Sequence, residues 1–267
     1  MGLDEDTALR RTGEGEYEGN IVEHWWTPRG PLGGYVMAIV HRGMELAVDD
    51  PARRPRSLNV YFLRPPHAGA ITVRPVVERV GRSLTTASAR LEQDGKLIAL
   101  GVAAFSAPWP GPELSEAPMP DVEPPGERAT SKGNGPGLQR RPPFMGRLTM
   151  QRRFGEPAFS GADHAETGGW LGLIEKREVD ATTLLVLADA WYPAPWPRLK
   201  ALAPAPTIEM SVMFRAHLPL PDSLMLGRFH TRLVRDGFFD EQGELWAPDG
   251  TLVAQSRQLA LLIGGEA

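Results

Sequence analysis

Apolar positions along the first third of the chain follow first a helical and then a strand-like pattern. Over residues 31–48 they cover most sides of a helix, with Gly33 and Gly34 in its first turn. The apolar residues are Val36, Met37, Ile39, Val40, Met44 and Leu46. Such a broad apolar surface predicts a helix that is buried on most sides.

Four strand patterns follow this helix. Their segments are rich in β-branched and aromatic residues or alternate apolar with polar positions, and they cover residues 57–64, 71–80, 84–91 and 97–105. The pair Asp94-Gly95 between the last two segments is typical of a tight hairpin. We therefore predict a helix followed by an antiparallel meander.

The second half of the chain has the same order. Asp180 is a suitable N-cap for a helix over residues 181–191, and Pro193 ends that helix. The strand patterns that follow cover residues 207–215, 224–234, 243–246 and 252–262. We interpret residues 236–243 as a hairpin loop, in which the neighbouring Phe238 and Phe239 indicate an interface or a pocket lid.

Short repeats support an internal duplication. DGKLIA at 94–99 matches DGTLVA at 249–254, an offset of 155 (249 minus 94). FLR at 62–64 matches MFR at 213–215, an offset of 151 (213 minus 62). Two matches in the same order at nearly one offset favour duplication over coincidence. A single curved sheet has open edges, so we expect the two copies to pair edge to edge.

A Pro- and Gly-rich stretch at 107–143 separates the two copies, and its composition suits neither a helix nor a central strand. We therefore divide the chain into an N-terminal unit at 1–108, a connection at 109–143 and a C-terminal unit at 144–267. The fold class expected from this order is α+β, with each sheet wrapped around a central helix.

Composition excludes several classes of protein. The chain contains no cysteine, which excludes disulfides, a Cys-based zinc site and a cysteine nucleophile. The net charge of −4 comes from interspersed signs, without a basic footprint for nucleic acid. No segment reaches the roughly 18 apolar residues of a membrane span, and the acidic residues at 4–6 do not fit a signal peptide. We expect a cytoplasmic protein. Its six dispersed histidines have no metal-ligand spacing, and no Gly-x-Ser-x-Gly elbow is present.

Six segments together resemble one known family, the TesB-type (thioesterase II-like) acyl-CoA thioesterases. The segments are GPLGGYVMAIVHRGM (30–44), LNVYFLRPPHAG (58–69), ERVGRSLTTASARLEQDGKLI (78–98), LLVLADAWYP (184–193), PTIEMSVMFR (206–215) and DGTLVAQSRQLALL (249–262). The resemblance implies a double hotdog fold, hydrolysis of acyl-CoA to free acid and CoA in fatty-acid and lipid metabolism, no cofactor or metal, and a homo-oligomer such as a dimer of double hotdogs.

The resemblance also assigns site residues. It implies a catalytic set of Asp189, Thr207 and Gln258, all in the second unit. This sequence departs from the family at Asn59, where many relatives have His, and at Glu209, and we expect both changes to alter substrate preference. Counting back by the two offsets places Ala38 and Ala103 at the positions of Asp189 and Gln258, so we predict one working site per chain.

The chemistry fits these residues. A carboxylate at the end of an apolar helix has its pKa raised by burial, which suits Asp189 as a general base, while Thr207 and Gln258 can orient a water. The backbone at the start of the first helix, residues Gly33, Gly34 and Tyr35, is the expected oxyanion and substrate contact. Arg64 and Arg82 are candidates for the CoA phosphates, and a surface salt bridge is an equal alternative for each.

Two other functions stay open at this point. A hotdog protein that binds acyl-CoA without turnover would keep the fold and the pocket. A hydratase is less favoured, because its Asp and His pair near the helix start is absent. Trp25 and Trp26, which precede the first helix, are interpreted as core or pocket wall.

Overall fold

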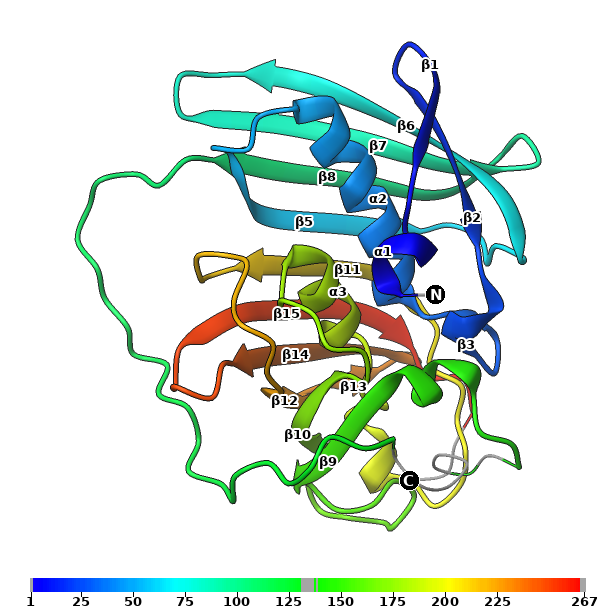
Figure 1. Cartoon of the computed structure of the whole chain (residues 1–267). Helices are drawn as coiled ribbons and strands as arrows, with labels where there is room; N and C mark the ends of the chain where they lie inside the picture. The colour runs from blue at the N-terminus through cyan, green and yellow to red at the C-terminus, as the bar shows by residue number, and fades with distance from the viewer. Residues whose placement is uncertain (1, 131–136, 138, 265–267) are drawn as a thin grey trace.

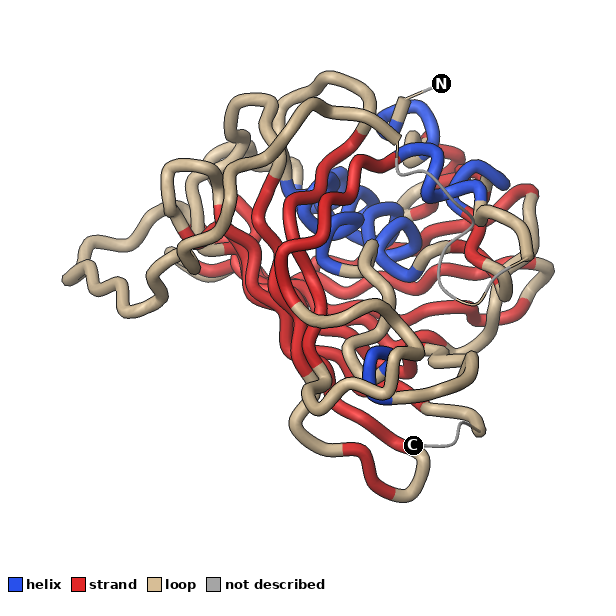
Figure 2. The backbone as a smooth tube through the Cα atoms, turned by 90° about the horizontal axis from the view of Figure 1, so that it is seen from below, coloured by secondary structure: helices blue, strands red, loops and turns tan. Residues whose placement is uncertain are grey.

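One large antiparallel sheet dominates the computed structural model of the chain, which describes residues 2–130, 137 and 139–264 (Figure 1). Thirteen strands form this sheet in the described part of the chain, and it curls around two central helices (Figure 2). No helix among the described residues is long and apolar enough to cross a membrane.

The first unit contains the predicted helix and all four predicted strands, with four additional strands before them. Its elements are α1 (Leu3–Asp6), β1 (Arg10–Gly13), β2 (Glu16–Ile21), η1 (Glu23–Trp25), β3 (Trp26–Thr27), β4 (Gly30–Pro31), α2 (Gly33–Val48), β5 (Arg54–Phe62), β6 (Gly69–Val80), β7 (Leu84–Gln93) and β8 (Lys96–Ser106). Leu46, which was expected on the buried surface of α2, is 42% exposed, because the last turns of that helix leave the core.

The second unit repeats this plan with three differences from the sequence prediction. Its elements are η2 (Pro143–Arg147), β9 (Leu148–Phe154), β10 (Glu166–Leu173), α3 (Ala181–Ala188), η3 (Trp196–Arg198), β11 (Thr207–Phe214), β12 (Met225–His230), β13 (Val234–Arg235), β14 (Phe238–Trp246) and β15 (Leu252–Leu261). Helix α3 stops at Ala188 rather than Trp191, the predicted strand 224–234 is broken between β12 and β13, and β9 and β10 were not predicted.

The interpretation of residues 236–243 as a loop is wrong. Only Asp236 and Gly237 make the turn, both with positive φ angles (53° and 77°), and β14 begins at Phe238. Phe239 is buried while Phe238 is exposed, as expected for neighbouring residues of a strand that covers a core on one face.

The two units join through their edge strands, as predicted. The order of the sheet is β1-β2-β6-β7-β8-β5-β11-β15-β14-β12-β10-β9, with β13 on β14. At the junction β5 and β11 run antiparallel, with Val60 opposite Met210 and Asn59 opposite Ser211. The junction pairs one edge strand from each unit, and both of these edges would be open if the units stood alone.

Helices α2 and α3 pack directly against each other inside this curved sheet. Gly34 lies at their contact: a Cβ on this residue would stand 2.3 Å from the carbonyl oxygen of Leu185 and 3.0 Å from Cα of Val186. Glycine is therefore required for the close approach of the two helices. This contact brings the first turn of α2 to the last turn of α3.

The connection between the units packs along the second unit. Its described residues 107–130 form neither helix nor strand, and its predicted residues 131–136 and 138 lie outside the described part. Trp170 Nε1 donates to the carbonyl of Glu123 at 2.9 Å, and Trp246 Nε1 donates to that of Ala117 at 3.0 Å. The connection thus satisfies two buried indole N–H groups and covers the sheet there.

Candidate active site

A cavity of about 620 Å³ opens where the start of α2 and the end of α3 meet strands β11 and β15. Five of the site residues named from the sequence line it, and these are Gly33, Arg64, Asp189, Thr207 and Gln258. Much of the remaining wall is apolar and includes Phe62, Phe144, Met145, Met150, Trp191, Tyr192, Trp196, Leu202, Phe239 and Leu261. A concave, mostly apolar site with a few convergent polar groups is typical of a small-molecule pocket.

Asp189 is the residue immediately after α3, where φ and ψ of −117° and 4° end the helix. Its side chain keeps some exposure toward the cavity, and Oδ2 accepts a hydrogen bond from the backbone N–H of Gly34 at 2.8 Å. Burial raises the pKa of Asp189 to about 6, although the N–H groups of Gly34 and Gly33 partly oppose this shift. A carboxylate with this pKa is a suitable general base near neutral pH.

Thr207 is placed by an irregularity at the start of β11. The register of β11 against β15 shifts between Thr207 and Glu209, which is a β-bulge. Bulges redirect side chains, and here Thr207 lines the cavity and donates from Oγ1 to Oε1 of Gln258 at 2.8 Å. Gln258 is not opposite Thr207 in the ladder, since its direct partner on β11 is Met210.

Glu241 is a residue of this site that the sequence analysis missed. It lies on β14 directly opposite Gln258 of β15, is only 6% exposed, and accepts from Gln258 Nε2 at 2.7 Å. Burial raises the pKa of Glu241 to about 7, and the charge of Asp189 adds to the shift. Alternation of Phe239, Glu241, Gly243 and Leu245 is the signal that indicates a strand with Glu241 facing inward.

The start of α2 differs in part from the expected oxyanion site. The N–H groups of Gly33 and Gly34 point at the Asp189 carboxylate. Tyr35 does not reach the cavity: its N–H donates to the carbonyl of Leu32 at 3.1 Å, and its buried ring stacks on Trp25. Trp25 is fully buried and belongs to the core.

Of the two predicted phosphate contacts, only Arg64 is at the cavity. Arg64 is exposed, lines the cavity and donates from Nη1 to the carbonyl of Leu97 at 2.8 Å. Arg82 lies in the turn between β6 and β7, at the opposite end of the long strands. Arg29, which was not predicted, is exposed and lines the same cavity as Arg64.

The two departures from the family pattern, Asn59 and Glu209, lie away from the cavity. Val60 and Met210 are buried toward the helices, so their strand neighbours Asn59 and Glu209 face the opposite side of the sheet. There Asn59 Nδ2 donates to Glu209 Oε1 and to Ser211 Oγ. The expected effect on substrate preference has no direct contact to act through; the cluster instead links β5 to β11.

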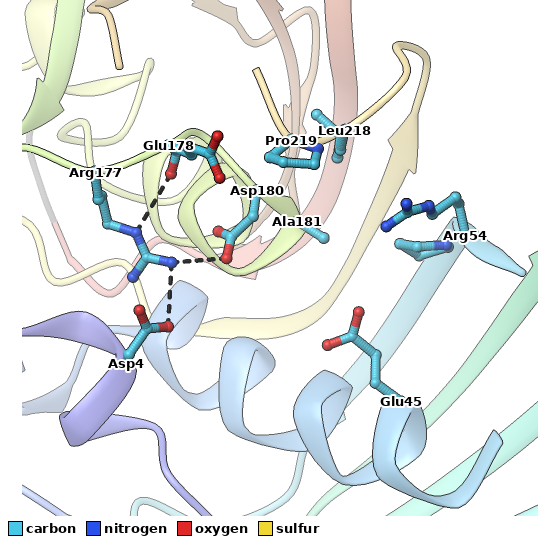
Figure 3. A pocket seen from close by; sticks show the side chains of 10 residues that line it. Asp4, Glu45, Arg54, Arg177, Glu178, Asp180, Ala181, Leu218 and Pro219 are labelled. Atoms are coloured by element: carbon cyan, nitrogen blue, oxygen red, sulfur yellow. Dashed lines mark hydrogen bonds and ion pairs between the residues drawn. The ribbon is translucent and has the colours of Figure 1, made fainter. Parts of the chain in front are cut away.

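A second, smaller hollow of about 310 Å³ lies at the other ends of the two helices (Figure 3). In Figure 3 Arg177 reaches both Asp4 and Asp180, with Nη2 at 3.2 Å and 2.7 Å from their carboxylate oxygens. Asp180 also accepts from the N–H of Thr183 at 2.8 Å and so caps α3, as predicted. These groups tie the N-terminal segment to the start of α3.

This hollow is the counterpart of the cavity in the duplicated fold. Counted from the first residue of each helix, the offset is 148 (181 minus 33), so His41 of α2 corresponds to Asp189, and the assignment of Ala38 is wrong by one helical turn. Phe62 and Phe214 are the last residues of β5 and β11, an offset of 152 (214 minus 62) that pairs Pro55 with Thr207. Pro55 lines the hollow, whereas His41 is fully buried between Phe105 and Phe214.

The second hollow therefore lacks the polar set of the cavity. His41 occupies the position of Asp189, Pro55 that of Thr207 and, by the hairpin offset, Ala103 that of Gln258. Among the described residues no group of three or more histidine, aspartate or glutamate side chains is arranged to hold a metal ion.

Comparison with known proteins agrees with this arrangement. Residues 22–106 match the model of the acyl-CoA thioesterase N-terminal domain, and residues 116–262 match that of the C-terminal domain. A search of curated proteins found no match.

Solved structures share the whole architecture. A protein with a hot dog fold from Alicyclobacillus acidocaldarius is 27% identical, with a TM-score of 0.87 over 98% of both chains. A putative thioesterase II from Thermobifida fusca YX is 26% identical, with a TM-score of 0.83 over 97% of this chain and 98% of that one. The tesB protein of Mycobacterium avium subs paratuberculosis, at 17% identity and a TM-score of 0.79 over 98% of both chains, has the same fold. With both domain models matched in order along a double hotdog, the chain belongs to the TesB-type acyl-CoA thioesterase family.

Proposed function

We propose that this chain hydrolyses acyl-CoA thioesters to free carboxylic acid and CoA, with Asp189 as the general base. The observation that carries the proposal is the position of the Asp189 carboxylate. It lies at the wall of an apolar cavity, has a pKa raised to about 6, and shares the cavity with Thr207 and Gln258. Thioester hydrolysis needs such a base together with groups that orient the attacking water.

The start of α2 supplies the electrostatic part of the mechanism. Its N–H groups at Gly33 and Gly34 stabilise one negative charge, which in the resting protein is the Asp189 carboxylate. The water oxygen attacks the carbonyl carbon as its proton passes to Asp189, so the charge moves to the thioester oxygen. The same helix N-terminus then stabilises the oxyanion. Collapse breaks the C–S bond, and the proton on Asp189 passes to the leaving thiolate.

The charged and the apolar parts of the cavity wall suit the two parts of an acyl-CoA substrate. The exposed guanidinium groups of Arg29 and Arg64 are suited to the phosphates of CoA, and the aromatic wall around Trp191 and Phe239 is suited to an acyl group. Because His41 and Pro55 stand at the positions that correspond to Asp189 and Thr207 in the first unit, each chain carries one catalytic site.

Release of free thiol from a panel of acyl-CoA esters tests the proposal. Asp189→Asn keeps the shape of the side chain and removes the base, so kcat should fall at least about a hundredfold. Asp49→Asn is the matched control, because Asp49 is the exposed residue that ends α2, and Asn tolerates its left-handed φ of 46°. Saturable binding of every ester without turnover by the unaltered chain would instead favour the acyl-CoA-binding protein.

A further inference from the structure

Glu241 stands directly behind the polar end of the cavity. It faces inward from β14, is 6% exposed, and does not line the cavity itself. Burying an ionisable group is costly unless hydrogen bonds compensate it. Glu241 has both compensating bonds, since Oε1 accepts from Gln258 Nε2 at 2.7 Å and Oε2 accepts from the N–H of Ala194 at 2.5 Å.

These two bonds fix the direction of a chain of donors. An ionised carboxylate only accepts hydrogen bonds, so the amide of Gln258 must turn its NH₂ group toward Glu241. Its oxygen is then left to face Thr207, whose Oγ1 donates to it at 2.8 Å. The orientation of the Gln258 amide therefore follows from the charge of Glu241.

The chain of donors determines what Thr207 offers to a water. Its single hydrogen is committed to Gln258, so its oxygen presents acceptor lone pairs toward the cavity. A water placed between this oxygen and the Asp189 carboxylate would give both of its hydrogens to the protein. Its remaining lone pair would then be free to attack a thioester carbon.

The second hydrogen bond of Glu241, from the N–H of Ala194, connects this hydrogen-bond network to the cavity wall. Ala194 belongs to the segment between α3 and η3 that carries Trp191 and Tyr192, both of which line the cavity. Glu241 thus joins the segment after Asp189 to the amide on β15. A change at Glu241 reaches the site through these two neighbours and through its charge interaction with Asp189.

We infer that Glu241 is a positioning residue, which orients the Gln258 amide and through it the Thr207 hydroxyl for attack by water. The inference rests on the proposed thioester hydrolysis and adds a fourth residue to the set of Asp189, Thr207 and Gln258. Its alternative is that Glu241 serves only to satisfy the N–H of Ala194 and to stabilise the fold.

Glu241→Gln separates these two roles. Glutamine has one acceptor oxygen for two donors, so either Ala194 loses its acceptor or the Gln258 amide turns over and reverses the Thr207 hydroxyl. With the best ester of the panel, kcat should fall roughly tenfold to a hundredfold while KM changes by less than about twofold. The control Glu244→Gln makes the same replacement on the outward face of β14 and should leave kcat unchanged.

A double-mutant cycle gives the deciding result. If Glu241 acts through Gln258, the variant E241Q/Q258A should be no slower than Q258A alone. The inference is overturned if the reductions in kcat from the two substitutions multiply in E241Q/Q258A, or if E241Q keeps the kcat of the unaltered chain. Either result leaves thioester hydrolysis in place. An unaltered chain that hydrolyses none of the esters overturns both. Should E241Q melt far below the unaltered chain, Glu241→Asp, which keeps the charge but shortens the reach, takes its place in the cycle with the same criterion.

Discussion

The backbone N–H of Gly34 and the carboxylate of Asp189 are joined by a hydrogen bond of 2.8 Å, although the residues are 155 positions apart. Gly34 belongs to the first turn of α2 and Asp189 follows the last turn of α3. Each unit of the duplication therefore supplies one side of this contact. The site is complete only when the two helices pack closely, which ties activity to the geometry of their crossing.

Gly34→Ala should disrupt that crossing. The added Cβ would stand 2.3 Å from the carbonyl oxygen of Leu185 and 3.0 Å from Cα of Val186, and backbone atoms of a packed helix cannot turn aside. We expect a loss of stability of about 1–3 kcal/mol or more, as for other overpacked cores. Urea unfolding measures it, and thiol release should fall further than the folded fraction because Asp189 moves from its donor.

Gly111→Ala is the control for this substitution. Gly111 lies in the connection, and a Cβ there would meet nothing within 4 Å. The control should unfold at the same urea concentration as the unaltered chain. A Gly34→Ala variant that unfolds there too would contradict the required close approach of α2 and α3.

The pH dependence of turnover follows from two carboxyl groups. Asp189 must be ionised to accept a proton, and burial raises its pKa to about 6. Glu241 must be ionised to orient Gln258, and its pKa is raised to about 7. Activity should therefore rise with pH between about 6 and 7, with apparent values that belong to the interacting pair. The measurement is kcat/KM from pH 5 to 9, and a flat profile across this interval would exclude both roles.

The sequence predicted the elements that the two units share and several polar residues of the candidate site. Both helices, the strands that follow them and an edge-to-edge junction of the two units were predicted from apolar patterns and from the duplicated FLR and DG segments, whereas the identity of β5 and β11 as the junction strands comes from the structure. Strands β1 and β9 were not predicted: β1 is exposed at every position, and β9 alternates poorly, so neither has a strong period-2 pattern.

The residues of the candidate site could be predicted better than the strand pairing and hydrogen bonds that join them. Asp189, Thr207 and Gln258 were named from the resemblance, and the raised pKa of Asp189 follows from its apolar helix. The bulge at Thr207 and the pairing of Gln258 with Glu241 depend on strand register, which the sequence does not specify alone. Arg82 was misplaced for a related reason, because the turn between β6 and β7 lies at the ends of these long strands that are opposite the cavity.

Asp189 should also reduce the stability of the protein at neutral pH. Its pKa is raised from 3.8 to about 6 on folding, so the folded state holds the proton more tightly than the unfolded state. The contribution of this group to stability is complete below pH about 4 and is lost as pH rises through about 6. Asp189→Asn, which cannot ionise, should therefore be more stable than the unaltered chain at pH 8, by no more than about 3 kcal/mol.

Urea unfolding at pH 4 and pH 8 tests this, with Asp49→Asn as the control in which an exposed carboxylate is replaced. A difference between Asp189→Asn and the unaltered chain that is the same at both pH values would mean that the carboxylate is as well solvated in the fold as in water, and it would remove the basis for Asp189 as a base tuned by burial.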